Sequence, residues 1–283
     1  MEGDYKERAE EARQACRLLS TYIDYKNCEG VAEVMVASNM WGFRGIVQTM
    51  GLGNLKPNIV CMRCPEIWRE ERHSEIPKNF VRIINDCSTA NKAVVIVKGL
   101  DEWPGEFQKH YGTIDLYWIV RDGGLMLLLS QLLRAKDSFE SCKILVFCIA
   151  EEDTEAEELK ADVKKFLYDL RMLAEVIVVT MKSWDAQIDQ EATEPGGDDT
   201  AMESFSQVRQ RIADRAKLHS SADSSSYNEQ QVNKFLYTTL KLNSIILRYS
   251  RMAAVVLVSL PPPPRHHPSY CYMEYMDLMI SVT

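Results

Sequence analysis

The chain has 283 residues, and its hydrophobic fraction of 46% is ordinary for a protein with a sizeable core in one large domain or two small ones. Its formal net charge of −8, without any basic stripe, excludes a general nucleic-acid binder, because neutralising phosphates requires clustered Lys and Arg. No apolar run approaches the roughly 20 residues that cross a bilayer, so we expect no membrane span.

The N-terminus is charged and predicted to be helical, without the apolar stretch of a secretory signal, which indicates a reducing compartment. The sequence contains eight cysteines scattered over predicted helices and strands. We therefore expect all of them to be reduced.

Strands and helices are predicted to alternate, because runs of β-branched, aromatic and aliphatic residues are separated by stretches in which apolar residues recur every three or four positions. Strands are expected at 31–37, 58–62, 93–97, 114–120, 143–149, 175–180 and 253–260. Helices are expected at 4–26, 42–50, 77–89, 125–133, 154–170, 228–249 and 268–280. This alternation predicts an α/β fold with a mostly parallel sheet and helices on both faces, an arrangement that resembles the universal-stress fold.

Residues 112–133, GTIDLYWIVRDGGLMLLLSQLL, are predicted to be the centre of the fold. The strand in this stretch is continuously apolar, so it should be buried on both faces, and Asp122 is expected to cap the helix that follows. That helix is nearly all apolar, which predicts that protein surrounds it. The corner carries no nucleophile, phosphate loop or metal ligands, and we interpret it as architectural.

A second helix with a clear signature starts near Thr154, where the capping-box spacing occurs. Its predicted buried face consists of Leu159, Val163, Phe166, Leu167 and Leu170.

The composition changes after Lys182, where an acidic stretch without Lys or Arg leads into a Ser-rich patch. We predict a first part of an α/β domain at 1–182, a disordered insertion at 183–226 with a helix near 207–217, and the last part of the domain at 227–283. The serines of the patch are candidate phosphorylation sites, because the segment is expected to be exposed and acidic residues flank it: Ser221, Ser224, Ser225 and Ser226.

The Cys61-Met62-Arg63-Cys64 segment has the spacing of a redox pair or of half a zinc site. A dithiol motif usually opens a helix, whereas this pair is predicted at a strand end, where Pro65 keeps Cys64 extended. No second pair completes a metal set, so a structural role is favoured.

The remaining candidates are weaker. Gly51 and Gly53 with Lys56 resemble a phosphate loop, but this loop follows a helix and precedes a strand, the reverse of a phosphate site. His266 and His267 lie in an expected exposed loop. Asp115 and Asp122 flank the central strand about 20 Å apart, too far for an acid/base pair. We expect no catalytic residue, no metal site and no cofactor.

Several longer segments occur in a familiar order: GLGNLKPNIV with PEIW, GTIDLYWIVRDGGLMLLLSQLL, SCKILVFCIAEEDTEAEELKADVKKFLYDLRMLAEVIVV, and VNKFLYTTLKLNSIILRYSRMAAVVLVSLPPPP with YMEYMDL. With these segments the chain resembles the cytosolic C-terminal domain of cation–chloride cotransporters over nearly its whole length. The RDGG that follows YWIV and the four prolines before HHPSYCYMEYMDL are most similar to the plant branch.

The resemblance implies a regulatory and dimerising domain on the cytosolic face of a membrane, in an electroneutral symporter of chloride with potassium and, in some branches, sodium. The implied partners are a second copy, the membrane domain and regulatory kinases. The family's ion sites lie in membrane helices, so this chain by itself should transport nothing, and it should not be an enzyme.

The family pattern also has a strand ahead of the point where Met1 stands and another after MEYMDL, so both sheet edges are expected to be incomplete. Some relatives hold a nucleotide, ATP or ADP, in this domain. Much of that pocket would come from the strand ahead of Met1, so no residue is assigned to it.

An alternative hypothesis is a free-standing nucleotide-binding α/β protein of the universal-stress kind. Such a protein would need a glycine-rich loop directly after a strand, and the sequence shows none.

Overall fold

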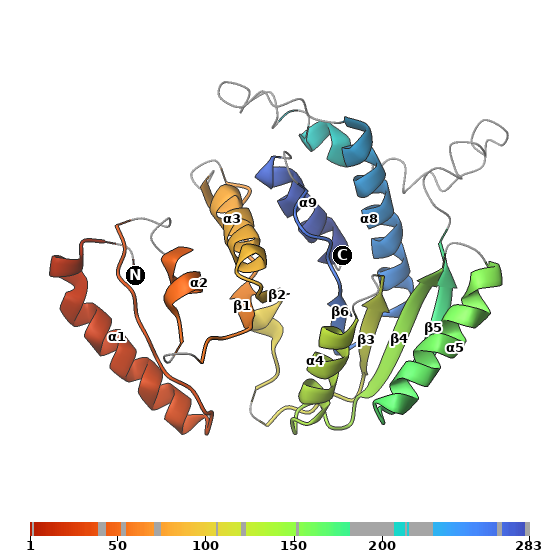
Figure 1. Ribbon diagram of the computed structural model, residues 1–283, viewed down its shortest axis with the longest axis horizontal. Coiled ribbons are helices and arrows are strands. Elements are labelled where there is room, and N and C mark those ends of the chain that lie inside the picture. The colour runs from red at the N-terminus through yellow and green to blue at the C-terminus, as the bar shows by residue number, and fades with distance from the viewer. Residues whose placement is uncertain are drawn as a thin grey trace. The chain divides into compact units, whose positions relative to one another are not determined.

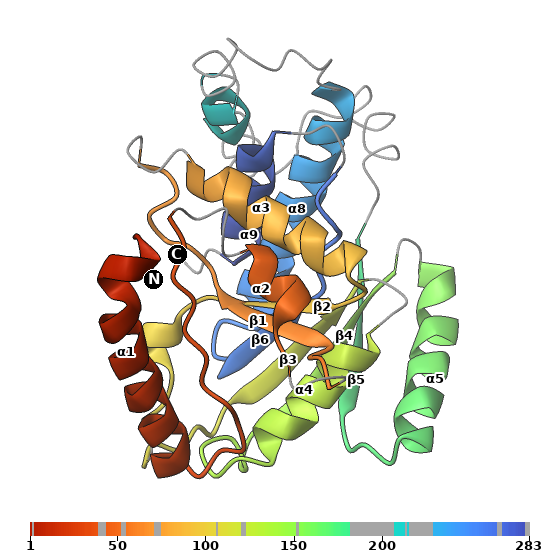
Figure 2. The ribbon, with the colours of Figure 1, turned by 60° about the vertical axis from the view of Figure 1, so that its left-hand side comes forward.

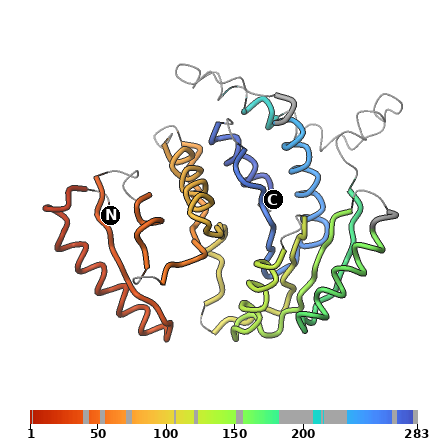
Figure 3. Tube along the Cα trace, viewed as in Figure 1, coloured from red at the N-terminus to blue at the C-terminus, as the bar shows by residue number. Residues whose placement is uncertain are grey.

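The computed structural model describes residues 1, 3–38, 44–51, 55–70, 75–105, 107–119, 123–150, 153–181, 207–212, 214, 229–264 and 268–280. The chain divides into two compact units, Met1–Lys98 and Gly99–Thr283, and Figure 3 traces the path of the backbone through each of them. Each unit has its own parallel sheet (Figure 1). The sequence predicted an α/β domain interrupted only by an insertion, and it did not indicate a boundary at Lys98–Gly99. The α/β class itself, with parallel strands, is confirmed.

The first unit contains three helices and two strands within its described residues. They are α1 (Tyr5–Tyr25), α2 (Arg44–Thr49), β1 (Ile59–Arg63), α3 (Glu75–Thr89) and β2 (Ala93–Val97). β1 and β2 are parallel, with Ile59 opposite Ala93 and Arg63 opposite Val97. α3 packs on β2 and on α2. Its apolar residues recur at helical spacing, and Phe80, Val81, Ile84 and Cys87 are buried.

α1 begins where the sequence predicted a helix. The Asp4 side chain caps it by accepting a hydrogen bond from the Lys6 backbone N–H at 2.8 Å. On the inner side of α1, the Cys16 thiol donates to the carbonyl of Ala32 at 3.3 Å. The extended segment after α1 therefore packs along it.

That extended segment, residues 31–37, was predicted to be a strand, and this prediction is wrong. Only Ala37 forms a bridge: its N–H donates to Met1 O at 3.0 Å, and its carbonyl accepts from Gly3 N at 2.9 Å. Its residues alternate between more and less exposed positions as a half-buried strand requires, but no strand among the described residues pairs with it. An alternating pattern predicts an extended backbone, whereas a sheet also requires a neighbour.

An ion pair joins α2 to α3 in this unit. The Arg44 guanidinium donates two hydrogen bonds to the Asp86 carboxylate, one of them from Nη2 to Oδ1 at 2.6 Å. The hydrogen bond to Asp86 raises the pKa of Arg44. A bidentate ion pair of this kind fixes the relative orientation of both side chains.

The second unit carries the four-stranded sheet. In chain order it contains η3 (Leu100–Glu102), β3 (Thr113–Trp118), α4 (Gly124–Arg134), β4 (Lys143–Ala150), α5 (Asp153–Asp169), β5 (Glu175–Thr180), α8 (Glu229–Tyr249), β6 (Val255–Val258) and α9 (Ser269–Ile280). The strand order is β5-β4-β3-β6, and all three pairings are parallel. β3 is an inner strand of this sheet, as the sequence predicted.

Helices cover both faces of this sheet, which confirms the prediction; Figures 1 and 2 show α4 and α5 on one side and α8 and α9 on the other. The core under α4 and α5 contains alternate residues of β3 and β4, together with Met126, Leu127, Val163 and Leu167 of the helices. The opposite core contains Tyr117, Phe147, Leu242, Ile246 and Met279. Successive residues of a strand point to opposite faces, so a continuously apolar strand supplies both cores.

Two helices of this unit are less buried than the sequence predicted. α4 buries Met126, Leu127 and Ser130, but Leu128 and Leu132 are 52% and 56% exposed, so the expectation that protein surrounds this helix is wrong within the single chain.

α5 begins at Asp153, one residue before the predicted capping box. It buries Val163 and Leu167, whereas Phe166 and Leu170 are exposed. Both helices cover the sheet with one narrow stripe of residues, while other apolar residues such as Leu128, Leu132 and Leu170 remain exposed.

Most of the predicted insertion at 183–226 lies outside the described residues. The described part, 207–212 and 214, is helical, which agrees with the predicted helix near 207–217, and Val208 and Ile212 are buried.

Candidate functional site

The corner between β3 and α4 is closely packed around a tryptophan. A Cβ added to Gly123 would lie 2.6 Å from Cδ2 of Trp118, so only glycine fits beside this indole. The same indole meets the ring of Phe166 on α5 edge-on, with ring centroids 5.8 Å apart. Gly123, and not Asp122, occupies the N-cap of α4, and Asp122 lies outside the described residues. The corner joins β3, α4 and α5, which supports the architectural interpretation.

A buried polar cluster lies on the opposite face of β3. Asp115 is fully buried, and neither of its carboxylate oxygens has a hydrogen-bond partner among the described residues. Two residues further along, the hydroxyls of Tyr117 and Ser250 hydrogen-bond to each other at 2.7 Å. Ser250 directly follows α8, so this bond connects the end of α8 to the inner strand of the sheet.

The protonation of this cluster follows from its burial. Burial raises the pKa of Asp115, while the nearby hydroxyls of Ser250 and Thr113 act in the opposite direction. Burial also raises the pKa of Tyr117 to about 12, so this phenol keeps its proton at physiological pH. The cluster therefore favours neutral groups, which suits a structural core better than charge-dependent catalysis.

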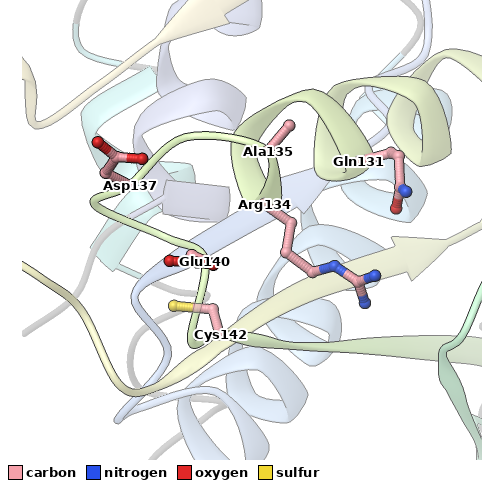
Figure 4. Close-up of a pocket in the computed structure, with 6 residues that line it drawn as sticks. All are labelled: Gln131, Arg134, Ala135, Asp137, Glu140 and Cys142. Carbon is pink, nitrogen blue, oxygen red and sulfur yellow. The ribbon is translucent and has the colours of Figure 1, made fainter.

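Two open hollows lie at the other end of α4. The first, of about 420 Å³, is lined by Gln131, Arg134, Ala135, Asp137, Glu140 and Cys142 (Figure 4). In Figure 4 the Arg134 side chain points away from the Asp137 carboxylate. The second, of about 410 Å³, shares Arg134 and Cys142 and extends past Lys143 to Glu175. The first lies near the amino end of β4 and the second at the amino ends of β4 and β5, whereas parallel α/β sheets bind ligands at the carboxyl ends of their strands.

The buried thiols do not have the properties of a catalytic cysteine. Burial raises the pKa of Cys87 and of Cys142, that of Cys148 to about 11 and that of Cys271 to about 12. A nucleophilic cysteine needs a lowered pKa, because the thiolate is the reactive form. None of the eight cysteines, each within the described part of the chain, forms a disulfide bond.

The structure separates the two cysteines of the C-x-x-C segment. Cys61 lies on β1 and is exposed, whereas Cys64 is 2% exposed, and its N–H donates to Val97 O at 2.8 Å, extending the sheet past β1. This geometry agrees with the structural role favoured from the sequence.

The glycine loop lies between α2 and β1, as predicted. Gly51 has φ +127, and an added Cβ would lie 2.5 Å from Leu55 O, so the turn itself requires glycine there. Lys56 Nζ donates to Gln48 O at 3.2 Å, so this amine binds the end of α2. Gly53 lies outside the described residues.

Several predicted positions are outside the described residues, so the structure does not test them. They are His266, His267, Ser221, Ser224, Ser225 and Ser226. Within the described ranges, no three side chains of His, Cys, Asp or Glu gather where they could hold a metal ion. None of the helices in those ranges is long and apolar enough to cross a membrane.

Sequence reasoning considered Asp115 only as half of an acid/base pair and missed its cluster with Tyr117 and Ser250. The available signal was an acidic residue inside a continuously apolar strand. Its neighbour Ser250 is distant along the chain, and only the pairing of β3 with β6 brings the two together.

Fold and site together define an α/β protein whose described residues show structural cores and no assembled catalytic group. A profile of the solute carrier family 12 matches residues 104–281, and the chain belongs to that family. The chain is 67% identical to cation-chloride cotransporter 1 of Arabidopsis thaliana over 290 aligned residues, which cover 99% of this chain and 29% of the relative.

Two rice proteins (Oryza sativa subsp. japonica) are similar to the same extent. Cation-chloride cotransporter 1 is 65% identical and cation-chloride cotransporter 2 is 67% identical, each over 99% of this chain and over 30% and 29% of the respective relative. The chain thus spans about 30% of the length of the curated relatives it matches. These similarities confirm the resemblance to plant cation–chloride cotransporters that the sequence motifs predicted.

Proposed function

We propose that this chain acts as a regulatory and dimerising part of an electroneutral cation–chloride symporter, which moves chloride with potassium, sodium or both. The observation that carries the proposal is the identity of 65–67% to three plant cotransporters over 99% of the chain. In this proposal the ion pathway lies in the part of the cotransporters that the chain does not match. The chain contributes contacts on the cytosolic face of a membrane and no catalysis.

The arrangement of the second unit supports a scaffolding role. Its sheet is covered on both faces, its thiols have raised pKa values, and its hollows lie at the amino ends of the strands. We include three partners: a second copy of the chain, the membrane part of the transporter, and kinases that phosphorylate Ser221, Ser224, Ser225 or Ser226. The proposal needs no cofactor, and submicromolar binding of ATP in calorimetry would contradict that part of it.

The test is a chimera. The matching segment of the Arabidopsis cotransporter is replaced by this chain, and chloride-dependent uptake of rubidium, a potassium substitute, is measured in a cell that lacks such transport. We expect uptake near that of the unaltered cotransporter, because about two thirds of the residues in the replaced segment stay identical.

A deletion of the same segment serves as the control, and it should lose most of the uptake while the protein still reaches the membrane. If the chimera and the deletion transport equally little at equal surface amounts, this chain does not supply the cotransporter's regulatory part.

A further inference from the structure

Asp115 is a carboxylic acid in the centre of an apolar sheet. Its neighbours in register are Leu145 on β4 and Val256 on β6, and both belong to the core under α8 and α9. The residue is 0% exposed, and neither buried carboxylate oxygen forms a hydrogen bond of normal geometry with a described residue. The hydroxyls of Ser250 and Thr113 are close enough to offset part of the effect of burial on the pKa of Asp115. A buried polar atom without a partner is unusual in a folded protein and calls for an explanation.

Among the described residues, the groups that face Asp115 carry no positive charge. From β3 the titratable neighbour is Tyr117, which itself interacts with Tyr249 at the end of α8, and the nearby hydroxyls are those of Ser250 and Thr113. β4, β5, β6 and α9 contribute apolar residues to this core, among them Phe147, Ile177, Val258 and Met279. No Lys, Arg or His in the described part of the chain donates a hydrogen bond to either oxygen. An ionised Asp115 would therefore be a buried charge without a counter-ion among the described residues.

The segment next to this carboxyl is a turn that closes on the start of β3. We call residues 250–254 the α8–β6 turn. The Ser250 N–H donates to Ile246 O at 2.7 Å, and the Ala254 N–H donates to Thr113 O at 2.8 Å. Gly112 lies so close that an added Cβ would be 2.9 Å from Met252 O. The turn therefore packs on the backbone of β3 at Thr113, two residues before Asp115.

The protonated and ionised forms of Asp115 favour different states of the turn. A protonated carboxyl can donate one hydrogen bond to the Ser250 hydroxyl, which already contacts Tyr117. An ionised carboxylate needs several donors, and water can supply them when the turn opens. The raised pKa that burial produces at Asp115 agrees with this preference.

We propose that Asp115 makes the α8–β6 turn a pH-sensitive latch, which stays closed on β3 while the carboxyl is protonated and opens more often once it is ionised. The closed state binds the proton more tightly than the open state does. The stability that Asp115 gives to the closed turn is therefore fully present below the ordinary Asp pKa of 3.8. It is lost as the pH rises from there through the raised pKa that Asp115 has in the closed state.

Hydrogen exchange of the 283-residue chain tests the latch. The protection factor of the Ala254 amide is measured from about pH 4 to about pH 9, which brackets the titration of a carboxyl with a raised pKa. Because opening releases one proton, the protection factor of the Ala254 amide should fall by up to about tenfold per pH unit over the titration range. Asp115→Asn keeps the shape of the side chain without its ionisable group, so the protection factor of the Ala254 amide should not change with pH. Asp137→Asn removes an exposed carboxyl of the same unit, and in this control the protection factor should fall with pH as in the unaltered chain.

If the protection factor of the Ala254 amide depended on pH equally in the unaltered chain and in Asp115→Asn, the proposal would be overturned. If Asp115→Asn does not fold, the infrared carbonyl band of a protonated carboxyl is followed in the unaltered chain. Because burial raises the pKa of Asp115, we expect a band that persists at pH values above the titration of ordinary carboxyls, and that shifts in frequency in Ser250→Ala. The absence of such a band, or a band insensitive to Ser250→Ala, would also overturn it.

Discussion

Gly112 stands at the point where β3 begins beside the α8–β6 turn. A Cβ at this position would lie 2.9 Å from Met252 O and 3.2 Å from Ala254 N. Both neighbours are backbone atoms, and the second is held by its hydrogen bond to Thr113 O. Neither can rotate away as a flexible side chain could. Gly124, in the first turn of α4, has nothing within 4 Å of its added Cβ and offers a matched comparison in the same unit.

We expect Gly112→Ala to lower the free energy of unfolding by about 1–3 kcal/mol, the usual cost of forcing an extra methyl group into a packed site. Gly124→Ala should leave it unchanged or raise it by up to about 1 kcal/mol, because alanine restricts the unfolded chain and favours the helix. Urea unfolding of both variants measures the difference. Equal stabilities would mean that the turn does not close on β3 as described.

At the scale of the secondary-structure elements, α4 shows what an apolar sequence can and cannot predict. Its residues are apolar almost throughout, yet only one stripe meets the sheet: Leu127 is 1% exposed, and its neighbour Leu128 is 52% exposed. The two leucines have the same chemistry and differ only in the direction in which the helix places them. They therefore form a matched pair for measuring what burial contributes.

Leu127→Ala is expected to lower the free energy of unfolding by about 2–5 kcal/mol, because it leaves a cavity in the core shared with β3 and β4. Leu128→Ala should cost less than about 1 kcal/mol in the isolated chain. Urea unfolding at low protein concentration gives both values. A comparable loss for Leu128→Ala would show that something covers the outer stripe of α4.

Elements with a strong local pattern were predictable from the sequence. β2 and β5 occupy the predicted residues, 93–97 and 175–180, because β-branched runs between polar turns specify a buried strand. The strand predicted at residues 31–37 was wrong, because strand pairing depends on a neighbouring strand that a local sequence pattern does not contain. The contact of Ser250 with Tyr117 arises from the order β5-β4-β3-β6 and could not be derived from either segment alone.

At the scale of the whole molecule, the division at Lys98–Gly99 was also beyond the sequence reasoning. Both units alternate strands with helices, so the same pattern continues through the boundary. Gly99 adopts a left-handed conformation with φ +70, and no atom lies within 4 Å of its added Cβ. The separation into two sheets is a property of strand pairing, which the alternation of elements does not specify.

The dimerisation included in the proposed function belongs to this scale. We expect sedimentation of the 283-residue chain to show a species of two chains at about micromolar concentration, since outward-facing leucines such as Leu128 and Leu132 leave apolar surface for a partner. Dilution should convert this species into single chains. A single chain at every concentration would contradict the dimerising role.

The position of β6 beside β3 has a consequence for how the protein is made. β3, β4 and β5 leave the ribosome in succession, but the strand that completes the other side of β3 follows only after the long stretch between β5 and α8 has been translated. Until then β3, whose residues 114–117 are all buried in the complete fold, has an unpaired edge. Nascent chains stalled before residue 255 should therefore recruit chaperones most strongly, and release should coincide with the synthesis of β6.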